Sequence, residues 1–179
     1  MGVILEEMLY HVNEKDEVLG KISRNKAHSK RILHRAGMVF LMSSGGKVLI
    51  NKRSSKHEIR PFCYDSSVSF HVKYRESYED SAKRETEEEL KIKAPLKFIG
   101  KFIHRDPPQI VSVFICLTDD NPIINSEEFS DGKFYSVNEA EKIILNEKTT
   151  PWLREGWKIL IKHLKTNYKN NLSLSNSNH

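Results

Sequence analysis

The chain has 179 residues, of which 38% are hydrophobic and 30% are charged, with 29 Lys and Arg against 24 Asp and Glu. This length fits one domain with a real core, whereas the longest apolar stretches, such as 110–116, are far shorter than the roughly 20 residues of a membrane span. The positive balance is mild and diffuse, which favours attraction of a phosphate ester and gives little support for nucleic-acid binding.

The two cysteines and both chain ends are typical of a soluble cytoplasmic protein. Cys63 and Cys116 provide neither a disulfide framework nor a metal-ligand spacing, so a reducing compartment is expected. The N-terminus lacks a basic region leading into an apolar one, and no secretory signal is expected. The segment 167–179 is mostly Asn and Ser and predicts a disordered tail after a single domain at 1–166. Both a monomer and a homodimer are compatible with this composition.

The N-terminal third of the sequence predicts two pairs of strands. Short apolar alternations at 8–12 and 18–22 flank a polar segment and predict a β-hairpin. A second pair, at 35–42 and 47–52, surrounds Ser43-Ser44-Gly45-Gly46, where two glycines are free to adopt positive φ.

Strands and helices alternate in the remainder. A polar loop at 54–61 leads to a strand predicted at 66–72 and a helix at 76–90. Three further strands are predicted at 96–103, 110–117 and 132–137, and two further helices at 138–146 and 151–164. This mixture predicts an α/β or α+β fold with a mixed sheet.

The helix predicted at 76–90 carries seven carboxylates, which usually indicates a charged face in solvent. At about 100° per residue, however, the carboxylates divide into two sets. Asp80 and Glu87 lie opposite the predicted buried stripe, while Glu85 and Glu89 lie at its edges and Glu88 lies on the same flank. The members of the stripe are Tyr78, Ala82, Thr86 and Leu90.

Glu85, Glu88 and Glu89 are therefore expected to project from one patch of the helix toward the domain. Converging carboxylates raise one another's pKa unless a cation lies between them. A hard divalent ion such as Mg²⁺ or Mn²⁺ resolves this repulsion. Because Mg²⁺ commonly binds substrate phosphates with one or two carboxylates, the pattern points to a polyphosphate as the ligand.

These residues resemble the Nudix box, a helix-centred motif with acidic positions at fixed spacing. The matching residues, in register, are Glu76, Arg84, Glu85, Glu88, Glu89 and Ile92. The similarity extends from about Tyr10 to Leu164, and segments such as 33–36 and 150–152 resemble the branch related to isopentenyl diphosphate isomerase. This resemblance implies a mixed β-sheet between helices and hydrolysis of a diphosphate linkage, with Mg²⁺ or Mn²⁺ held by the three glutamates.

The resemblance also implies roles for residues around the metal. Glu76 and Arg84 are expected to brace the box by pairing, although an exposed pair that never meets is the alternative. On their chemistry, Lys52 and Arg53 could clamp phosphate oxygens or lie as solvated charges without a role, and together with His71 they are the candidate substrate contacts. Glu127 and Glu128 could supply a base near the cleft or simply lie on the surface, and Trp152 is expected in the core.

Isopentenyl diphosphate isomerase is the main rival activity. Its catalytic cysteine corresponds to Ser69, and the strand at 107–114 lacks the acidic residues that the isomerase carries there, so isomerisation is not expected. His34 and His71 match isomerase metal ligands, and His28 lies one residue out of spacing from a third. A hydrogen-bonded structural histidine is the more ordinary reading of each.

Several family glycines are replaced. Phe70 and Lys91 stand where the box has glycine, Arg75 precedes the box glutamate where glycine is common, and Phe62 follows Pro61 where glycine is usual. The loop entering the helix must therefore be strained or follow another path. For this reason a Nudix-fold binding module without turnover is the alternative function.

Overall fold

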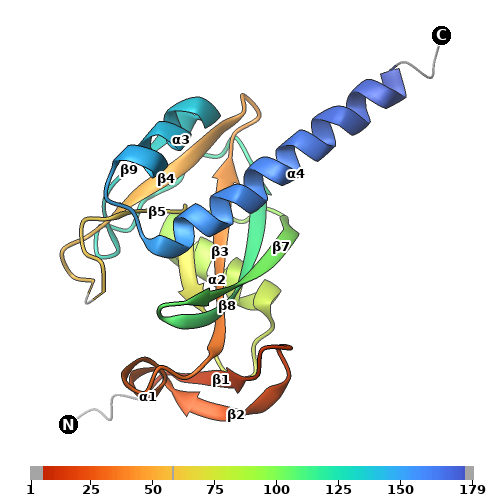
Figure 1. Cartoon of the computed structure of the whole chain (residues 1–179). Helices are drawn as coiled ribbons and strands as arrows, with labels where there is room; N and C mark the ends of the chain where they lie inside the picture. Colours follow the sequence, from red (N-terminus) through yellow and green to blue (C-terminus); the bar gives the residue numbers. More distant parts are fainter. Residues whose placement is uncertain (1–5, 58, 176–179) are drawn as a thin grey trace.

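The computed structural model describes residues 6–57 and 59–175 and shows a mixed β-sheet with helices on both of its faces (Figure 1). In chain order the elements are β1 (Met8–Val12), β2 (Val18–Ser23), α1 (Arg24–Ser29), β3 (His34–Met42), β4 (Lys47–Arg53), β5 (Tyr64–Asp65), β6 (Val68–His71), α2 (Tyr78–Leu90), β7 (Leu96–Arg105), β8 (Pro108–Leu117), β9 (Phe129–Ser136), α3 (Val137–Asn146) and α4 (Pro151–Ser175). The predicted mixed sheet between helices is confirmed.

Strand β3 is the centre of the sheet. It pairs in parallel with β8 along its whole length, from His34 opposite Gln109 to Met42 opposite Leu117, and antiparallel with β6 on the other side. β4 meets β3 at Met42 and Val48 and then pairs with β9. Because β3 and β8 are covered on both faces, they read as nearly continuous apolar runs.

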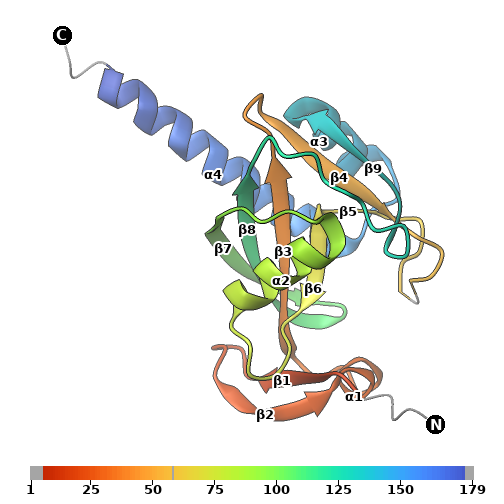
Figure 2. The ribbon, with the colours of Figure 1, turned by 180° about the vertical axis from the view of Figure 1, so that it is seen from behind.

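Two hydrophobic cores lie on opposite faces of β3, because successive side chains of a strand point to opposite sides. Met38 and Phe40 belong to the core under α3 and α4. Val39 and Leu41 belong to the core under α2. The two opposite views show α4 crossing one face and α2 the other (Figures 1 and 2).

The N-terminal hairpin is confirmed, and it has a small core of its own. Leu9, Ile22 and Ala27 are buried together, with Ile32 against them. The short helix α1 and the two-residue strand β5 were not predicted from the sequence. Six and two residues are too few to show a periodic pattern, so sequence alone gives no signal for either.

Helix α4 continues to Ser175, well beyond the end predicted at residue 164. The structure thus places 167–175 in a helix where the composition predicted a disordered tail, and residues 176–179 lie outside the described residues. Extending a helix adds one hydrogen bond per residue once a packed turn exists, so polar residues can follow the packed half of α4. In the described part of the chain, every helix is too short or too polar to cross a lipid bilayer.

The missing box glycines have two different structural solutions. Phe62, Arg75 and Lys91 all adopt positive φ, at 60°, 78° and 57°, as glycine would. Phe70 instead lies in β6, paired with Gly37 of β3. The loop into α2 therefore follows the strained course, and no different path is required.

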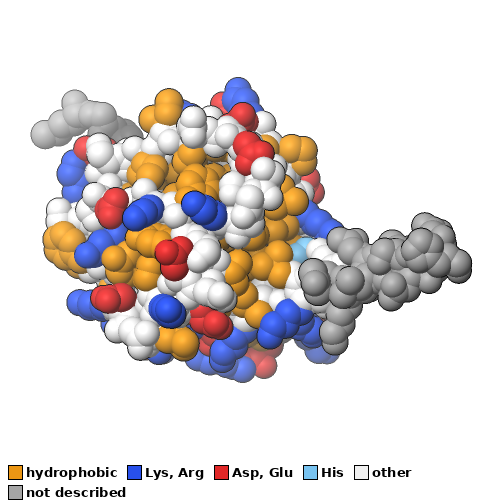
Figure 3. Space-filling model, turned by 90° about the horizontal axis from the view of Figure 1, so that it is seen from above, with side chains coloured by type: hydrophobic (Ala, Val, Ile, Leu, Met, Phe, Trp, Pro, Cys, Tyr) orange, Lys and Arg blue, Asp and Glu red, His pale blue; other side chains and the backbone are white. Residues whose placement is uncertain are grey.

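The surface seen from above carries hydrophobic side chains interspersed with acidic and basic ones (Figure 3). On this face no large field of one charge is visible, in agreement with the modest net charge of +5.

Candidate functional site

An open cavity of about 410 Å³ lies where β3, β6 and β8 face helix α2 and the loops around it. Its floor is formed by small or apolar residues, including Ala36, Gly37 and Val111, with Phe70 beside them. The polar walls fall into three groups, which are carboxylates from α2 and the loop before β9, basic residues from β4 and its following loop, and histidines near α1 and the end of β6.

The carboxylate wall contains two of the three predicted metal ligands. Glu85 and Glu89 both line the cavity, and Glu89 is 8% exposed. The Oε2 atom of Glu89 is buried and has no hydrogen-bond partner among the described residues. Burial, followed by the nearby charges of Glu85 and Glu128, raises the pKa of Glu89 well above its usual value. Burial also raises the pKa of Glu85, although Arg84 opposes this effect. A cation would relieve both penalties.

Glu88 does not belong to this wall. Its side chain is 56% exposed and accepts a hydrogen bond from Arg84 Nη1 at 3.2 Å. The expectation that all three glutamates converge on the domain is therefore not met by this arrangement. Glu88, at i+3 from Glu85, lies on the flank of the helix and shares the Nη1 atom of Arg84 with Glu85.

The predicted brace of the box is present. The guanidinium of Arg84 donates to Glu76 from Nε to Oε1 and from Nη2 to Oε2, each at 2.9 Å. Arg84 also contacts Glu85 at 2.6 Å, and Ser81 donates to Glu76. Hydrogen bonding from Arg84 lowers the pKa of Glu76. This bidentate pair fixes the loop before α2 to the helix that carries Glu85 and Glu89.

Arg53 supplies the basic side of the cavity. Its Nη1 donates to the buried Asp65 at 3.0 Å, and its guanidinium carbon lies 5.8 Å from the centre of the Trp152 ring. Trp152 packs against the core under α3 and α4, as predicted, and also lines the cavity, where it donates from Nε1 to Asp65 at 3.1 Å. Lys52 is not among the described lining residues, and its ammonium lies 5.3 Å from the Tyr64 ring centre.

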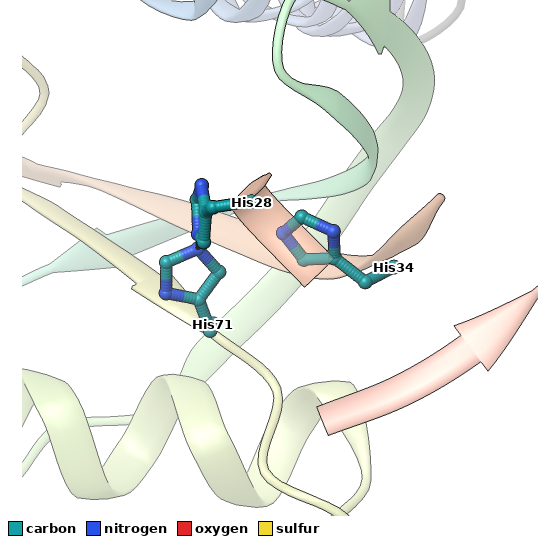
Figure 4. Close-up of side chains that lie close together, drawn as sticks. All are labelled: His28, His34 and His71. Carbon is teal, nitrogen blue, oxygen red and sulfur yellow. Dashed lines mark hydrogen bonds between the residues drawn. The ribbon is translucent and has the colours of Figure 1, made fainter. Parts of the chain in front are cut away.

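Three histidines gather at the other end of the cavity (Figure 4). One ligand atom each from His28, His34 and His71 lies within 4.8 Å of the others. His34 donates from Nδ1 to the carbonyl of Ile32 at 2.7 Å, which directs the lone pair of Nε2 toward the cluster, because an amide carbonyl can only accept. Burial lowers the pKa of His34 to about 4 and that of His71 well below its usual value. Neutral imidazoles of this kind are suitable ligands for a divalent transition metal.

The histidine cluster is closed on one side by the amide of Gln109. Gln109 Nε2 lies 3.2 Å from Nε2 of both His34 and His71. Ser69, which also lines the cavity, donates to Asp65 at 3.0 Å. Each of the three histidines has a hydrogen-bond partner, as the structural reading expects, and the fold also brings all three together as a candidate ligand set.

Loop residues complete the cavity. Glu127 and Glu128 line it together with the α2 carboxylates, and both side chains are also exposed to solvent, at 66% and 41%. His57 also lines the cavity and had not been singled out. These side chains lie in irregular segments without periodic signal, and only the tertiary fold brings residue 57 beside residue 128.

The fold and this cavity define an α+β protein in which carboxylates of an acidic helix and basic residues of β4 and its following loop line one open cavity. The model of the NUDIX domain matches residues 32–155, so the chain belongs to the Nudix family. Isopentenyl-diphosphate Delta-isomerase 2 of Photorhabdus laumondii is 29% identical over 160 residues, covering 84% of this chain and 90% of that protein. A Nudix hydrolase of Deinococcus radiodurans is 32% identical over 139 residues, covering 75% and 81%.

A solved structure agrees with this assignment. The crystal structure of DR0079 from Deinococcus radiodurans superposes with a TM-score of 0.75 at 28% identity, covering 85% of this chain and 98% of that chain. The sequence resemblance to Nudix proteins and to the isomerase-related branch is thereby confirmed.

Proposed function

We propose that the protein is a metal-dependent hydrolase that cleaves the diphosphate linkage of a nucleoside diphosphate derivative or another small organic diphosphate. Membership of the Nudix family supports a hydrolase of this general kind. The observation that carries the proposal is the buried, unpartnered carboxylate oxygen of Glu89 beside Glu85, facing a cavity that Arg53 also lines. A buried acid in this state requires either a proton or a cation, and the second acid beside it favours the cation.

Glu85 and Glu89 would hold Mg²⁺ or Mn²⁺. Glu88, which directly precedes Glu89 and is about one turn from Glu85, lies beside them on the helix. When bound, such an ion neutralises charge on phosphoryl oxygens and lowers the pKa of a coordinated water. Arg53 would bind phosphate oxygens, since its guanidinium lines the cavity and Asp65 holds it from the far side. Glu128 is the carboxylate outside the helix that is suited to accept a proton from the attacking water.

Hydrolysis fits the cavity better than isomerisation. Isomerisation of an alkene requires groups that remove and return a proton at carbon. At the positions that the isomerase uses, this chain has the hydroxyl of Ser69 and the amide of Gln109. Ser69 is occupied by Asp65 and Ser66, and Gln109 lies against the histidines. Neither group is a strong base at neutral pH.

The histidine cluster supports a second cation site in the same cavity. Its ligands are neutral nitrogens, so it favours softer ions than the carboxylate wall does. Separately, the two cysteines are free and buried, which supports a reducing, cytoplasmic location.

The test is hydrolysis of a panel of nucleoside and organic diphosphates with Mg²⁺ or Mn²⁺, comparing the wild type with Glu89→Gln and Glu85→Gln. We expect metal-dependent product release that falls at least about a hundredfold in Glu89→Gln, because charge stabilisation at the phosphoryl group is lost. Glu87→Gln is the matched control, since Glu87 is on the opposite side of α2 and pairs with Lys93. An inactive wild type that still binds a diphosphate would favour a binding module instead.

A further inference from the structure

His57 connects two walls of the cavity that come from distant parts of the chain. Its Nδ1 lies 2.7 Å from Nη2 of Arg53, and its Nε2 lies 2.8 Å from the carbonyl oxygen of Glu128. The Glu128 carboxylate is also near, with Oε2 at 3.3 Å from the same ring nitrogen. The imidazole is therefore the bridge between a basic and an acidic residue that both face the ligand.

The partners of His57 determine which of its ring nitrogens carries the proton. A guanidinium can only donate hydrogen bonds, so Nδ1 must accept from Arg53. A carbonyl can only accept, so Nε2 must donate to Glu128. The contacts thus require a neutral ring in the Nε2–H form. Burial and the charge of Arg53 lower the pKa of His57, in agreement with this form.

The loops around His57 are also joined by other contacts, but these reach Arg53 only at its backbone, where its carbonyl accepts from Ser130 at 3.3 Å and the strand pair places it opposite Phe129. Ser54 donates to the carbonyl of Glu127 at 2.6 Å, and the side chains of Lys56 and Glu127 form an exposed pair. On its other edge, the guanidinium of Arg53 is held by Asp65. Among the described contacts, His57 alone joins Arg53 to Glu128.

We propose that His57 is a positioning residue that orients Arg53 for the phosphate and Glu128 for the attacking water. This inference rests on the proposed function and assigns a role to a residue outside the Nudix box. Held between Asp65 and His57, the guanidinium has lost rotational freedom before a ligand arrives. The same imidazole donates to the backbone carbonyl of Glu128, which also accepts from the backbone N–H of Ser54 at 2.9 Å, and it lies 3.3 Å from the Glu128 carboxylate. One ring thus contacts, through two separate nitrogens, both the residue proposed to bind phosphate and the residue proposed to accept the proton.

The two hydrogen bonds can be removed separately. In His57→Asn the amide oxygen replaces Nδ1 as the acceptor for Arg53, but the side chain is too short to replace Nε2–H. In His57→Gln the amide nitrogen can replace Nε2–H as the donor to Glu128, but the acceptor for Arg53 is lost. We expect the Asn variant to keep KM and lose about tenfold in kcat, and the Gln variant to raise KM about tenfold with a smaller change in kcat.

His104 provides a matched control. It also lies between a carboxylate and a carbonyl, with Glu155 at 3.1 Å and the carbonyl of Asp106 at 2.7 Å, but it does not line the cavity. His104→Gln should lower the melting temperature without separating KM from kcat. If kcat and KM change together in both His57 variants, and these changes follow the fall in melting temperature, His57 is merely structural and the proposal is overturned.

Two measurements do not depend on turnover. Nitrogen-15 NMR of the imidazole at neutral pH should show the Nε2–H tautomer, and calorimetry with inorganic pyrophosphate and Mg²⁺ should show weaker binding for His57→Gln than for His57→Asn. An Nδ1–H tautomer, or equal pyrophosphate affinity in the two variants, would refute the positioning role even in an active enzyme. If both measurements give the expected result in a protein that hydrolyses no diphosphate, the proposed function fails and the placement of Arg53 by His57 stands.

Discussion

The ring of Phe70 lies against the α-carbon of Gly37 on the neighbouring strand. A Cβ atom added at position 37 would stand 2.3 Å from Cζ of the ring and 2.7 Å from Cε2. The two residues are opposite one another in the antiparallel pair of β3 and β6, and both line the cavity. Phe70 stands where the Nudix box has glycine, and the residue opposite it, Gly37, has no side chain and leaves room for the large ring.

We therefore expect Gly37→Ala to destabilise the protein by about 2 kcal/mol, because the ring must leave its position in a packed strand pair. Urea unfolding measures this change. Gly20→Ala is the matched control, since nothing lies within 4 Å of a Cβ at that strand position. Adding Phe70→Leu to Gly37→Ala should recover part of the loss. Full additivity of the two substitutions would contradict direct contact as the cause.

Most of the fold could be predicted from hydrophobic periodicity, and the glycine replacements show where such prediction ends. The strands of the central sheet and the helix α2 are long enough for alternation and helical spacing to be visible. The sequence also indicated strain near Arg75 and Lys91. It could not indicate that Phe70 would remain in a regular strand, because that outcome depends on which residue of β3 lies opposite.

Lys91 ends α2 in the left-handed conformation, with φ of 57° and ψ of 28°. A non-glycine residue in this region costs about 1–2 kcal/mol of backbone strain. Glycine avoids most of this strain, but it loses more chain entropy on folding. Lys91→Gly should therefore stabilise the protein by about 0.5–1 kcal/mol, as measured by urea unfolding. Glu87→Gly, in the exposed interior of the same helix, should instead destabilise by about 1 kcal/mol. Loss of stability in both variants would mean that Lys91 contributes contacts that outweigh its strain.

The site was predictable only where it lies on a regular element. Helical angles placed Glu85 and Glu89 toward the body of the domain, and both line the cavity. The same angles placed Glu88 on the flank of this patch, but they could not show that its side chain would be 56% exposed and paired with Arg84. Glu128 comes from a loop far along the chain from β4, where spacing carries no information.

Asp16 holds the N-terminal hairpin against the rest of the domain. The carboxylate accepts from Arg35 at 2.7 Å and from Lys101 at 2.5 Å, and its side chain is 18% exposed. Burial alone would raise the pKa of Asp16, but Lys101 and Arg35 together lower it. An acid whose pKa is lower in the folded state than in the unfolded state stabilises the protein at pH values above its unfolded pKa. This contribution is lost as the pH falls through the folded pKa.

We expect Asp16→Asn to lower the free energy of unfolding by about 2 kcal/mol at pH 7, since charge-assisted hydrogen bonds are lost. The difference from the wild type should shrink as the pH falls below about 4, first because the unfolded wild-type carboxylate takes up a proton and then because the folded one does so at its lowered pKa. Unfolding curves at pH 7 and pH 3 measure both effects. Asp131→Asn is a control with an exposed carboxylate. A difference that stays constant with pH would show that the charge of Asp16 is not the cause.

The buried ring of His34 should make the fold sensitive to mild acid. It is 0% exposed, and burial lowers its pKa from 6.5 to about 4. An imidazole whose folded pKa is below its unfolded value takes up a proton on unfolding, so stability falls as the pH drops from 6.5 toward 4. The full shift corresponds to about 3 kcal/mol. His34→Asn, which can still donate to Ile32, should flatten this part of the stability curve while lowering stability at pH 7.

NMR titration of the His34 ring gives the companion measurement, with a midpoint near 4 expected for the folded protein. Stability curves of wild type and variant that run parallel between pH 7 and pH 4.5 would show that another group controls acid unfolding.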